Sequence, residues 1–337
     1  MTPPTGKALV IGASGFIGSH LTQQLVTAGR KVRILTRPSS NTQATDHLDI
    51  ERCTGDVTQI DSLQQAMTGC SSVFYCVADT RTWLKDPLSL LAIHVDGLYN
   101  AMDAAIATGI ERFIFTSSFI TVGHTKNGPS NEDTAFNWWD SAPEYIRSLV
   151  TAEKRFLEYC IDHHLYGIAC CMGNAYGSGD YAPTPQGKLI LNVSQGKLPF
   201  YWSGGCPSVG IHDAAKALIL AEQYGINGQR YVIAERWLGY KELFKLAAST
   251  GKVMKPNIGL PLWLMTPLTL LRNLVMRMRG KTSHLNTAFF QCIRKASDID
   301  NSKTKQQLHW RPEPVERAII EAVEFYQQEH QKHTAPD

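Results

Sequence analysis

The sequence predicts an α/β protein with a doubly wound parallel sheet joined to a smaller C-terminal lobe. Two observations carry this prediction. Strand and helix patterns alternate for about 170 residues, and the first strand pattern runs directly into a glycine-rich loop, Gly12–Gly18, that opens a helical pattern. At 337 residues, 43% hydrophobic and 19% charged, the chain has an ordinary globular composition. A net charge of +3 gives no support for a nucleic-acid partner.

The first element is the all-apolar run Ala8–Ile11, the pattern of a parallel strand buried on both faces. Apolar residues after the glycine loop recur at helical spacing up to Gly29, which is placed as a helix C-cap. Gly12 permits a tight turn, Gly15 allows backbone to approach a diphosphate, and Gly18 allows close helix packing. The free N–H groups of the helix N-terminus favour an anion. This Rossmann-type junction predicts a dinucleotide site formed by Gly12, Ser14, Gly15, Phe16, Ile17 and Gly18.

The second predicted strand, residues 31–36, ends at Arg37-Pro38-Ser39-Ser40. In a Rossmann-type fold this position faces the adenosine ribose, where an acid binds the 2′-hydroxyl and a base accepts a 2′-phosphate. No Asp or Glu occurs from Lys31 to Gln43. Arg37, with Arg33 nearby, therefore favours NADP over NAD; a solvated loop arginine is the alternative interpretation.

Three further predicted strands end in residues suited to the same edge. Residues 50–54 lead to Gly55-Asp56-Val57, where Asp56 either accepts a hydrogen bond from the adenine amino group or caps the next helix. Residues 73–77 lead to the small Ala78, and after a helical pattern over 87–108, strand 112–116 ends at Ser117-Ser118. Ligands of such sheets bind beyond the carboxyl ends of the strands. We therefore expect Gly12, Arg37, Asp56, Ala78 and Ser118 to lie along one edge.

The segment 143–163 has a helical pattern and contains Tyr145-x-x-Ser148 followed by Ala152-Glu153. Other motifs are Gly-x-x-Gly-x-x-Gly at 12–18, Gly55-Asp56-Val57, Thr116-Ser117-Ser118 and Asn174-Ala-Tyr176-Gly177-Ser-Gly179-Asp180. With these motifs nearly the whole chain resembles the extended short-chain dehydrogenase/reductase family, which includes NAD-dependent epimerases and dehydratases. It is most similar to the branch of dihydroflavonol-reductase-like and 3β-hydroxysteroid-dehydrogenase-like enzymes. Pro183-Thr-Pro-Gln-Gly-Lys188 and Ile211-His212-Asp213 support that branch.

The resemblance implies a catalytic Ser, a catalytic Tyr and a Lys four residues after the Tyr. Ser118 takes the place of the Ser that orients the substrate oxygen, and Tyr145 takes the place of the proton donor. The resemblance also implies that Val57, Tyr145 and Asn174 contact the cofactor. The Lys position, however, is Leu149. Lys154 does not substitute for it, because nine residues place it about 180° round the helix from Tyr145.

The loss of this lysine affects the two reaction directions differently. A phenol with no neighbouring cation is about one-thousandth ionised at pH 7. Alcohol oxidation needs the phenolate, whereas carbonyl reduction needs the abundant protonated phenol. In one interpretation, a slower reductase keeps Tyr145 and Ser118, and a water, His124 or Arg147 supplies what the lysine normally would. In the other, the fold keeps its nucleotide without chemistry, as a binding or regulatory protein.

The later part of the chain predicts a substrate lobe. We assign residues 1–178 to an NADP-binding domain, with returning segments near 205–235 and 296–331, and residues 179–204 and 236–295 to the lobe. Aromatic residues outside regular helical spacing predict an apolar pocket or an interface between the lobes; they are Trp138, Trp139, Tyr181, Phe200, Tyr201 and Trp202. Residues 261–281 are interpreted as an amphipathic helix buried against the lobe, with a dimer surface or a membrane-surface contact as alternatives. The last helical pattern, 314–331, is expected to pack back on the first domain.

The eight cysteines form no C-x-x-C pair, which predicts reduced, buried thiols in a cytoplasmic protein and no metal site. No apolar run approaches the ~20 residues that span a bilayer. The sequence therefore predicts an NADP-dependent reductase of a hydrophobic carbonyl compound, with NAD as the alternative cofactor, acting as a monomer or homodimer. A nucleotide-sugar epimerase or dehydratase and a catalytically impaired dinucleotide-binding protein are the alternatives.

Overall fold

The computed structural model describes residues 5–78, 87–125, 127–278 and 287–334. Its centre is a seven-stranded sheet in the order β10-β6-β5-β4-β1-β2-β3, in which every neighbouring pair is parallel. The strands are β1 (Lys7–Ile11), β2 (Val32–Thr36), β3 (Glu51–Thr54), β4 (Cys70–Tyr75), β5 (Arg112–Ser118), β6 (Gly167–Met172) and β10 (Arg230–Ile233). β1 has β2 on one side and β4 on the other, so the strand order reverses at β1. Ligands of such sheets bind at the carboxyl ends of the strands beside this reversal.

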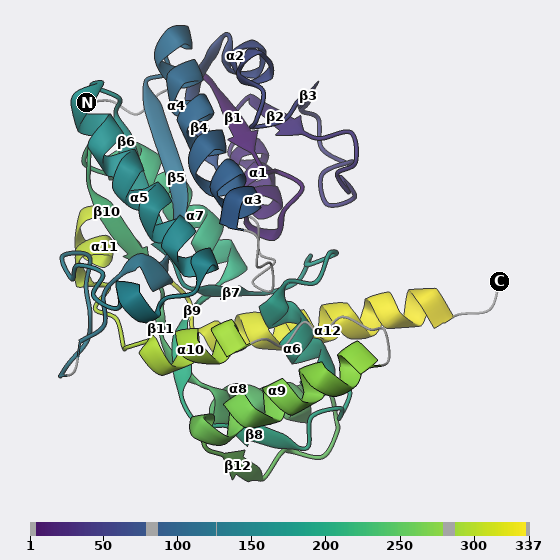
Figure 1. Cartoon of the computed structure of the whole chain (residues 1–337). Coiled ribbons are helices and arrows are strands. Elements are labelled where there is room, and N and C mark those ends of the chain that lie inside the picture. The colour runs from purple at the N-terminus through teal and green to yellow at the C-terminus, as the bar shows by residue number, and fades with distance from the viewer. Residues whose placement is uncertain (1–4, 79–86, 126, 279–286, 335–337) are drawn as a thin grey trace.

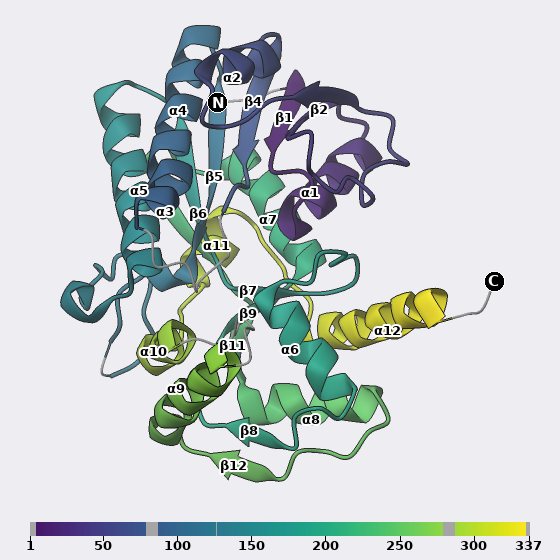
Figure 2. The ribbon, with the colours of Figure 1, turned by 45° about the vertical axis from the view of Figure 1, so that its right-hand side comes forward.

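Helices cover both faces of the sheet (Figures 1 and 2). One face carries α2 (Ile60–Met67), α4 (Gly97–Thr108) and α5 (Glu144–Asp162), packed through a core that includes Leu63, Leu98 and Phe156. The other face carries α1 (Phe16–Thr27) and α7 (Ile211–Tyr224), packed through Leu21 and Leu218. All six residues of β6 are buried, as expected for a strand covered on both faces. The predicted Rossmann-type α/β fold is confirmed.

The segment before α4 departs from the predicted continuous helix over 87–108. It consists of α3 (Pro87–Leu91) and a π-helical turn, η1 (Ala92–Asp96), which leads directly into α4. π-helical turns inside α-helices often occur at functional sites. On the other side of β5, the short helices η2 (Phe119–Thr121) and η3 (Trp139–Ser141) lead towards α5. Both segments therefore lie close to the carboxyl end of β5.

A smaller lobe adjoins this edge of the sheet. β7 (Asn174–Tyr176), β9 (Gly205–Gly210) and β11 (Arg236–Gly239) form a three-stranded sheet, and β8 (Phe200–Trp202) pairs with β12 (Ile258–Leu260). The lobe helices are α6 (Pro185–Ser194), α8 (Tyr240–Thr250), α9 (Leu262–Met278) and α10 (Thr287–Lys295), while α11 (Ser302–Gln307) packs on β10. Trp202 lies in the core of the lobe, against Tyr240, Phe244 and Phe290.

The last helix, α12 (Val315–Thr334), packs mainly on α8 and α6 of the smaller lobe, which differs from the predicted packing on the first domain. It also contacts β7 and β9, two strands that the sequence assigns to the first domain and that the structure places in the three-stranded sheet of the lobe. Its stripe of Val315, Ile319 and Val323 is fully buried in the core of the lobe. The sequence also predicts that the helix within residues 261–281 buries its apolar side chains against the lobe. In α9, Met265 is buried in this way, whereas the apolar side chains of Trp263 and Leu270 are exposed. Residues 279–281 of the predicted amphipathic segment lie outside the described part of the chain.

Candidate active site

The glycine loop after β1 brings backbone segments too close together for side chains at two of its glycines. Gly12 has a φ of +89°, and a Cβ atom there would lie 2.6 Å from the carbonyl oxygen of Cys76, which follows β4. A Cβ at Gly18 would collide with the carbonyl oxygen of Gly12. α1 begins after Gly15 with no side-chain cap and no acidic residue in its first turn. Its first N–H groups and its positive dipole end are therefore left for a ligand, which fits the diphosphate of a dinucleotide.

Arg37 and Asp56 follow β2 and β3 at the same edge. Arg37 is exposed. Asp56 Oδ1 accepts hydrogen bonds of 2.9 Å from both the backbone N–H and the hydroxyl of Thr58. The backbone hydrogen bond from Thr58 is the main cause of the lowered pKa of Asp56, and the Arg37 charge contributes to it. Asp56 thus makes a local turn with Thr58 and does not cap α2 as the sequence allowed, because the N-cap of α2 is Gln59. Its contact with the adenine amino group stays a prediction.

The side chains of Asn100 and Arg33 form hydrogen bonds near the ends of β2 and β3. The Asn100 side chain, on α4, donates to the carbonyl oxygen of Val57 at 2.9 Å and fixes the loop after β3. Arg33 does not join Arg37 as expected. Its guanidinium donates to the Glu51 carboxylate at 2.8 Å and to the carbonyl oxygen of Ala66 at 2.8 Å. Arg33 therefore joins β2 to β3 and α2. Arg37 is then the arginine of this pair that remains exposed at the end of β2.

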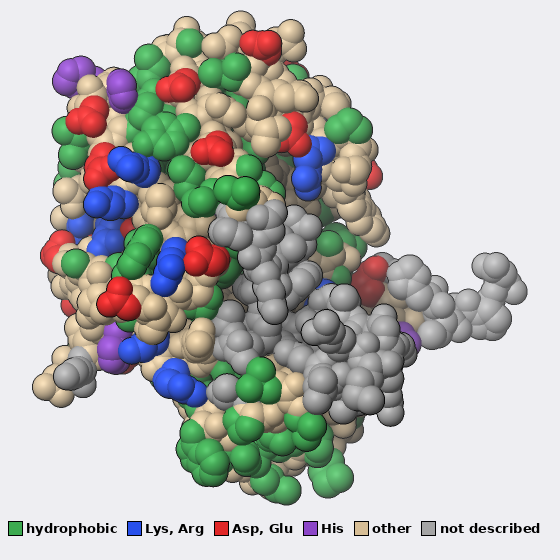
Figure 3. Space-filling model, in the orientation of Figure 1, with side chains coloured by type: hydrophobic (Ala, Val, Ile, Leu, Met, Phe, Trp, Pro, Cys, Tyr) green, Lys and Arg blue, Asp and Glu red, His purple; other side chains and the backbone are tan. Residues whose placement is uncertain are grey.

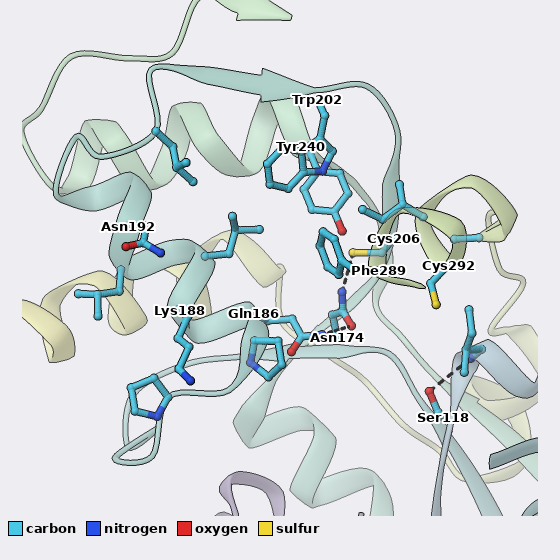
Figure 4. Close-up of a pocket in the computed structure, with 18 of the residues that line it drawn as sticks. Ser118, Asn174, Gln186, Lys188, Asn192, Trp202, Cys206, Tyr240, Phe289 and Cys292 are labelled. Atoms are coloured by element: carbon cyan, nitrogen blue, oxygen red, sulfur yellow. Dashed lines mark hydrogen bonds between the residues drawn. The ribbon is translucent and has the colours of Figure 1, made fainter. Parts of the chain in front are cut away.

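Ser118 and Tyr145 line one cavity of about 790 Å³, together with Asn174 (Figure 4). Ser118 ends β5 and Tyr145 lies in the first turn of α5. Most of the other walls are apolar and include Ile120, Ile146, Leu189, Leu198, Trp202, Phe289 and Ile293. Three cations also line the cavity: Lys188, Lys197 and Arg272. The cavity extends from the sheet edge into the smaller lobe.

A polar cluster forms part of the lobe wall, as the dashed lines in Figure 4 show. Asn174 Nδ2 donates to Cys206 Sγ at 2.9 Å, and Asn174 Oδ1 accepts from Gln186 Nε2 at 3.0 Å. Burial raises the pKa of the Cys206 thiol, so this thiol stays neutral. The sequence predicts a site role for Asn174 in this cluster but not for Gln186 or Cys206, which follow it in the chain by 12 and 32 residues. The predicted contact of Asn174 with the cofactor stays a prediction.

Leu149 lies in an apolar cluster beside Tyr145. It is 9% exposed and packs with Ile120, Trp138 and Ile146, and the ring of Tyr145 packs against the same cluster. Trp138, predicted to line a pocket or interface, belongs to this cluster, whereas Trp139 and Tyr181 are exposed. The position of the expected lysine is therefore packed among apolar side chains.

The two residues proposed from sequence to replace the lysine face elsewhere. Arg147 donates to the carbonyl oxygens of Trp139 and Asp140, and it forms an ion pair with Glu144. His124 forms backbone hydrogen bonds with the Asn137 side chain. Among the described residues that line the cavity, neither His124 nor Arg147 is found.

His94, which the sequence analysis missed, contacts this region instead. It lies in the π-helical turn, is 3% exposed, and its Nδ1 lies 2.8 Å from Ser148 Oγ. Ser148 Oγ also lies 2.8 Å from the carbonyl oxygen of Tyr145, so one hydroxyl on α5 links the histidine to the backbone of Tyr145. The imidazole ring also meets the Tyr145 ring edge to face, with centroids 5.9 Å apart. The available signal was a histidine on the apolar face of the predicted helix, four residues before Leu98.

A buried ion pair holds the strand beneath Ser118. Glu153, 3% exposed, accepts from Arg230 Nη1 at 2.7 Å, Thr121 Oγ1 at 2.8 Å and Ser117 Oγ at 2.5 Å. These contacts join α5, β5, η2 and β10. Ser118 lies on β5 and Tyr145 on α5. The hydrogen bonds of the buried Glu153 carboxylate hold these two elements together.

The chain is similar to known proteins over nearly its whole length. Residues 8–234 match the model of the NAD dependent epimerase/dehydratase family. The chain is 26% identical over 329 residues to a putative dihydroflavonol 4-reductase of Synechocystis, covering 94% of each chain. It is 25% identical over 325 residues to sterol demethylase protein B of Methylococcus capsulatus, covering 95% of this chain and 98% of that protein. The crystal structure of gox2253 superimposes with a TM-score of 0.85 at 28% identity, covering 96% of this chain and 98% of that one.

Proposed function

Because the chain belongs to the NAD dependent epimerase/dehydratase family, we propose that it is an NADP-dependent reductase of a hydrophobic carbonyl compound. The observation that carries this proposal is the shared cavity of Ser118 and Tyr145, whose walls are mostly apolar and which meets the carboxyl edge of the sheet. Two relatives that match nearly the full chain carry names that refer to a sterol and a dihydroflavonol, both compounds with large apolar ring systems. We assign cofactor binding to the sheet domain and substrate binding to the smaller lobe.

The cofactor assignment depends on two features of the sheet edge. The uncapped start of α1 and the glycine loop fit the diphosphate, and Arg37 supplies a cation where a 2′-phosphate would lie. When bound, the cofactor supplies the hydride. All eight cysteines are free, which fits the reducing cytoplasm that we propose as the location of the protein.

The chain's own residues would then handle the carbonyl oxygen. Ser118 Oγ donates a hydrogen bond that orients it, and Tyr145 Oη donates the proton that completes the alcohol. The cluster of Ile120, Trp138, Ile146 and Leu149 packs against the Tyr145 ring, and the proposed step uses the phenol in the neutral form that carries the proton. Hence Leu149 is compatible with reduction, although it removes the cation that alcohol oxidation would use.

The test follows NADPH oxidation against aromatic, steroid and β-keto carbonyl compounds. We expect Tyr145→Phe to lower kcat by 10²-fold or more, since it removes the proton donor. The matched control is Tyr181→Phe, because Tyr181 is exposed and does not line the cavity. Activity unchanged in Tyr145→Phe would contradict the role given to the phenol. For the cofactor, Arg37→Ser should raise KM for NADPH by about 10- to 100-fold and leave KM for NADH nearly unchanged.

One observation favours a second candidate, a nucleotide-sugar epimerase or dehydratase. Lys188, Lys197 and Arg272 line the cavity, and cations of this kind suit a diphosphate. Such an enzyme returns its cofactor to the starting state in each cycle. Mass spectrometry of the purified protein distinguishes the two, because a retained dinucleotide together with a sugar diphosphate would favour the second candidate.

A further inference from the structure

Charge is distributed very unevenly between the smaller lobe and the rest of the chain. Residues 181–212 and 243–297 contain 11 of the 33 Lys and Arg residues and none of the 30 Asp and Glu residues. The remainder of the chain is therefore acidic in net charge, although the whole protein carries only +3. Neither the sheet domain nor the dinucleotide site explains why these two stretches of the lobe contain no acidic residue.

α9 carries an exposed apolar stripe on this basic lobe. Trp263 is 70% exposed, Leu270 56% and Leu271 60%, and Pro267 is also exposed. At ~100° per residue these four positions fall within about 100° of the helix circumference. The buried residues Met265 and Thr269 lie on the opposite side, facing the lobe. α9 thus has apolar side chains on its solvent-facing side as well as on the side that packs against the lobe. An ordinary surface helix has polar side chains on its solvent-facing side.

The segment before α9 has the same character. Met254 is 89% exposed and Ile258 is 64% exposed, and the exposed cations Lys252 and Lys255 lie beside them in sequence. Figure 3 shows hydrophobic side chains gathered over the end of the molecule formed by α9, β8 and β12. We call this surface the basic apolar face, defined by Met254, Ile258, Trp263, Leu270 and Leu271 with Lys252 and Lys255.

We propose that the basic apolar face docks on a bilayer surface with anionic headgroups. Apolar and aromatic side chains with neighbouring cations are what the headgroup boundary accommodates, and cations gain attraction from anionic lipids. Residues 243–297, which carry this face, contain no acidic residue that would repel the headgroups. None of the described helices is long and apolar enough to cross a bilayer, so the contact is peripheral.

Two other occupants fit the surface less well. A second copy of the chain would bring two acid-free basic surfaces together, and like charges oppose that contact. A soluble anionic ligand would account for the cations but would leave Trp263, Leu270 and Leu271 facing water. The bilayer is the partner that uses both the charge and the apolar stripe.

Vesicle flotation of the full chain tests the proposal without any assay of catalysis. We expect binding to vesicles of phosphatidylcholine mixed with phosphatidylglycerol, little binding to phosphatidylcholine alone, and weaker binding as salt rises. Each cation removed should lower the partition coefficient by about 5-fold, the equivalent of ~1 kcal/mol. The pair Lys252→Gln and Lys255→Gln should therefore lower it by about 25-fold, and Trp263→Ser with Leu270→Ser should lower it by 10-fold or more.

Matched controls lie on α5 of the sheet domain. Ile161, 69% exposed, is changed to Ser, and Lys154, also exposed, is changed to Gln. Neither change should alter flotation, and circular dichroism confirms that each variant is folded. Equal flotation with neutral and anionic vesicles, or equal loss in the control variants, would overturn the proposal. A dimer in light scattering that Trp263→Ser dissociates, without vesicle binding, would assign the face to a second copy instead.

Discussion

Restoring the cation beside Tyr145 tests the account of Leu149 most directly. In Leu149→Lys the new side chain lies four residues after Tyr145 on α5, a spacing that puts Cβ atoms about 5–6 Å apart. An ammonium held roughly 6 Å from the phenolic oxygen stabilises the phenolate by about 2.8 kcal/mol at an effective dielectric constant of about 20. This equals about two pH units. At pH 7 the phenolate population, and with it the rate of alcohol oxidation by NADP⁺, should rise by up to ~100-fold.

The assay compares rate–pH profiles for both directions on one alcohol–carbonyl pair. The alkaline rise of oxidation should move down by about two pH units, whereas reduction at pH 7 should change little. Leu149→Met keeps the volume without the charge and serves as the packing control. The gain must also disappear in the double variant with Tyr145→Phe. A gain that survives removal of the phenol, or an unshifted profile in a folded Leu149→Lys protein, would refute the reasoning.

Four other substitutions have defined outcomes. Gly12→Ala places a Cβ 2.6 Å from a carbonyl oxygen at a φ of +89°, so it should cost about 1–3 kcal/mol in urea unfolding and weaken NADPH binding in a fluorescence titration. Arg230→Met leaves Glu153 as a buried, unpaired charge and should cost about 3–5 kcal/mol, part of which Glu153→Gln in the same chain should restore. Burial lowers the pKa of His20 to about 4, and the unfolded chain binds that proton below about 6.5. Stability should therefore be complete above pH 6.5 and fall by about 3 kcal/mol as the pH drops towards 4, a slope that His20→Gln removes. His94→Ala should lower kcat for reduction by about 10- to 100-fold with KM for NADPH unchanged, because it loosens the turn that carries Tyr145; an equal loss in NADPH binding would show a general structural role.

The sheet domain could be predicted closely from the sequence because its signals are local. Apolar runs such as Ala8–Ile11 are long enough to identify strands, and the glycine loop defines both a turn and the start of α1. Buried parallel strands also leave few alternatives, since both of their faces must be apolar. The alternation of elements then constrains the topology. Of the predicted strand ends, Gly12, Arg37, Asp56 and Ala78 accordingly follow β1, β2, β3 and β4, and Ser118 is the last residue of β5.

The smaller lobe was harder to predict because its contacts join distant segments. α12 has an apolar stripe that would fit either domain, and only the shape of the core around Trp202 and Phe244 places it in the lobe. The strands β7, β9 and β11 are short and come from three separate parts of the chain. Residue spacing also cannot show that Asn174, Gln186 and Cys206 converge on one cavity wall, since each belongs to a different segment.

Leu149 stands where the family resemblance implies a lysine, and the structure is needed to interpret this difference. Sequence alone leaves open whether another cation replaces the lysine. In the structure, Leu149 is enclosed by Ile120, Trp138 and Ile146, so three separate segments are shaped around a hydrocarbon side chain. Apolar surroundings favour the neutral form of an acid, and a neutral phenol is the proton donor that carbonyl reduction requires. The packing that surrounds Leu149 is therefore compatible with the neutral phenol that the proposed direction of the reaction uses. In the proposed reductase no replacement cation is needed, and the contact of His94 with Ser148 joins the π-helical turn to α5.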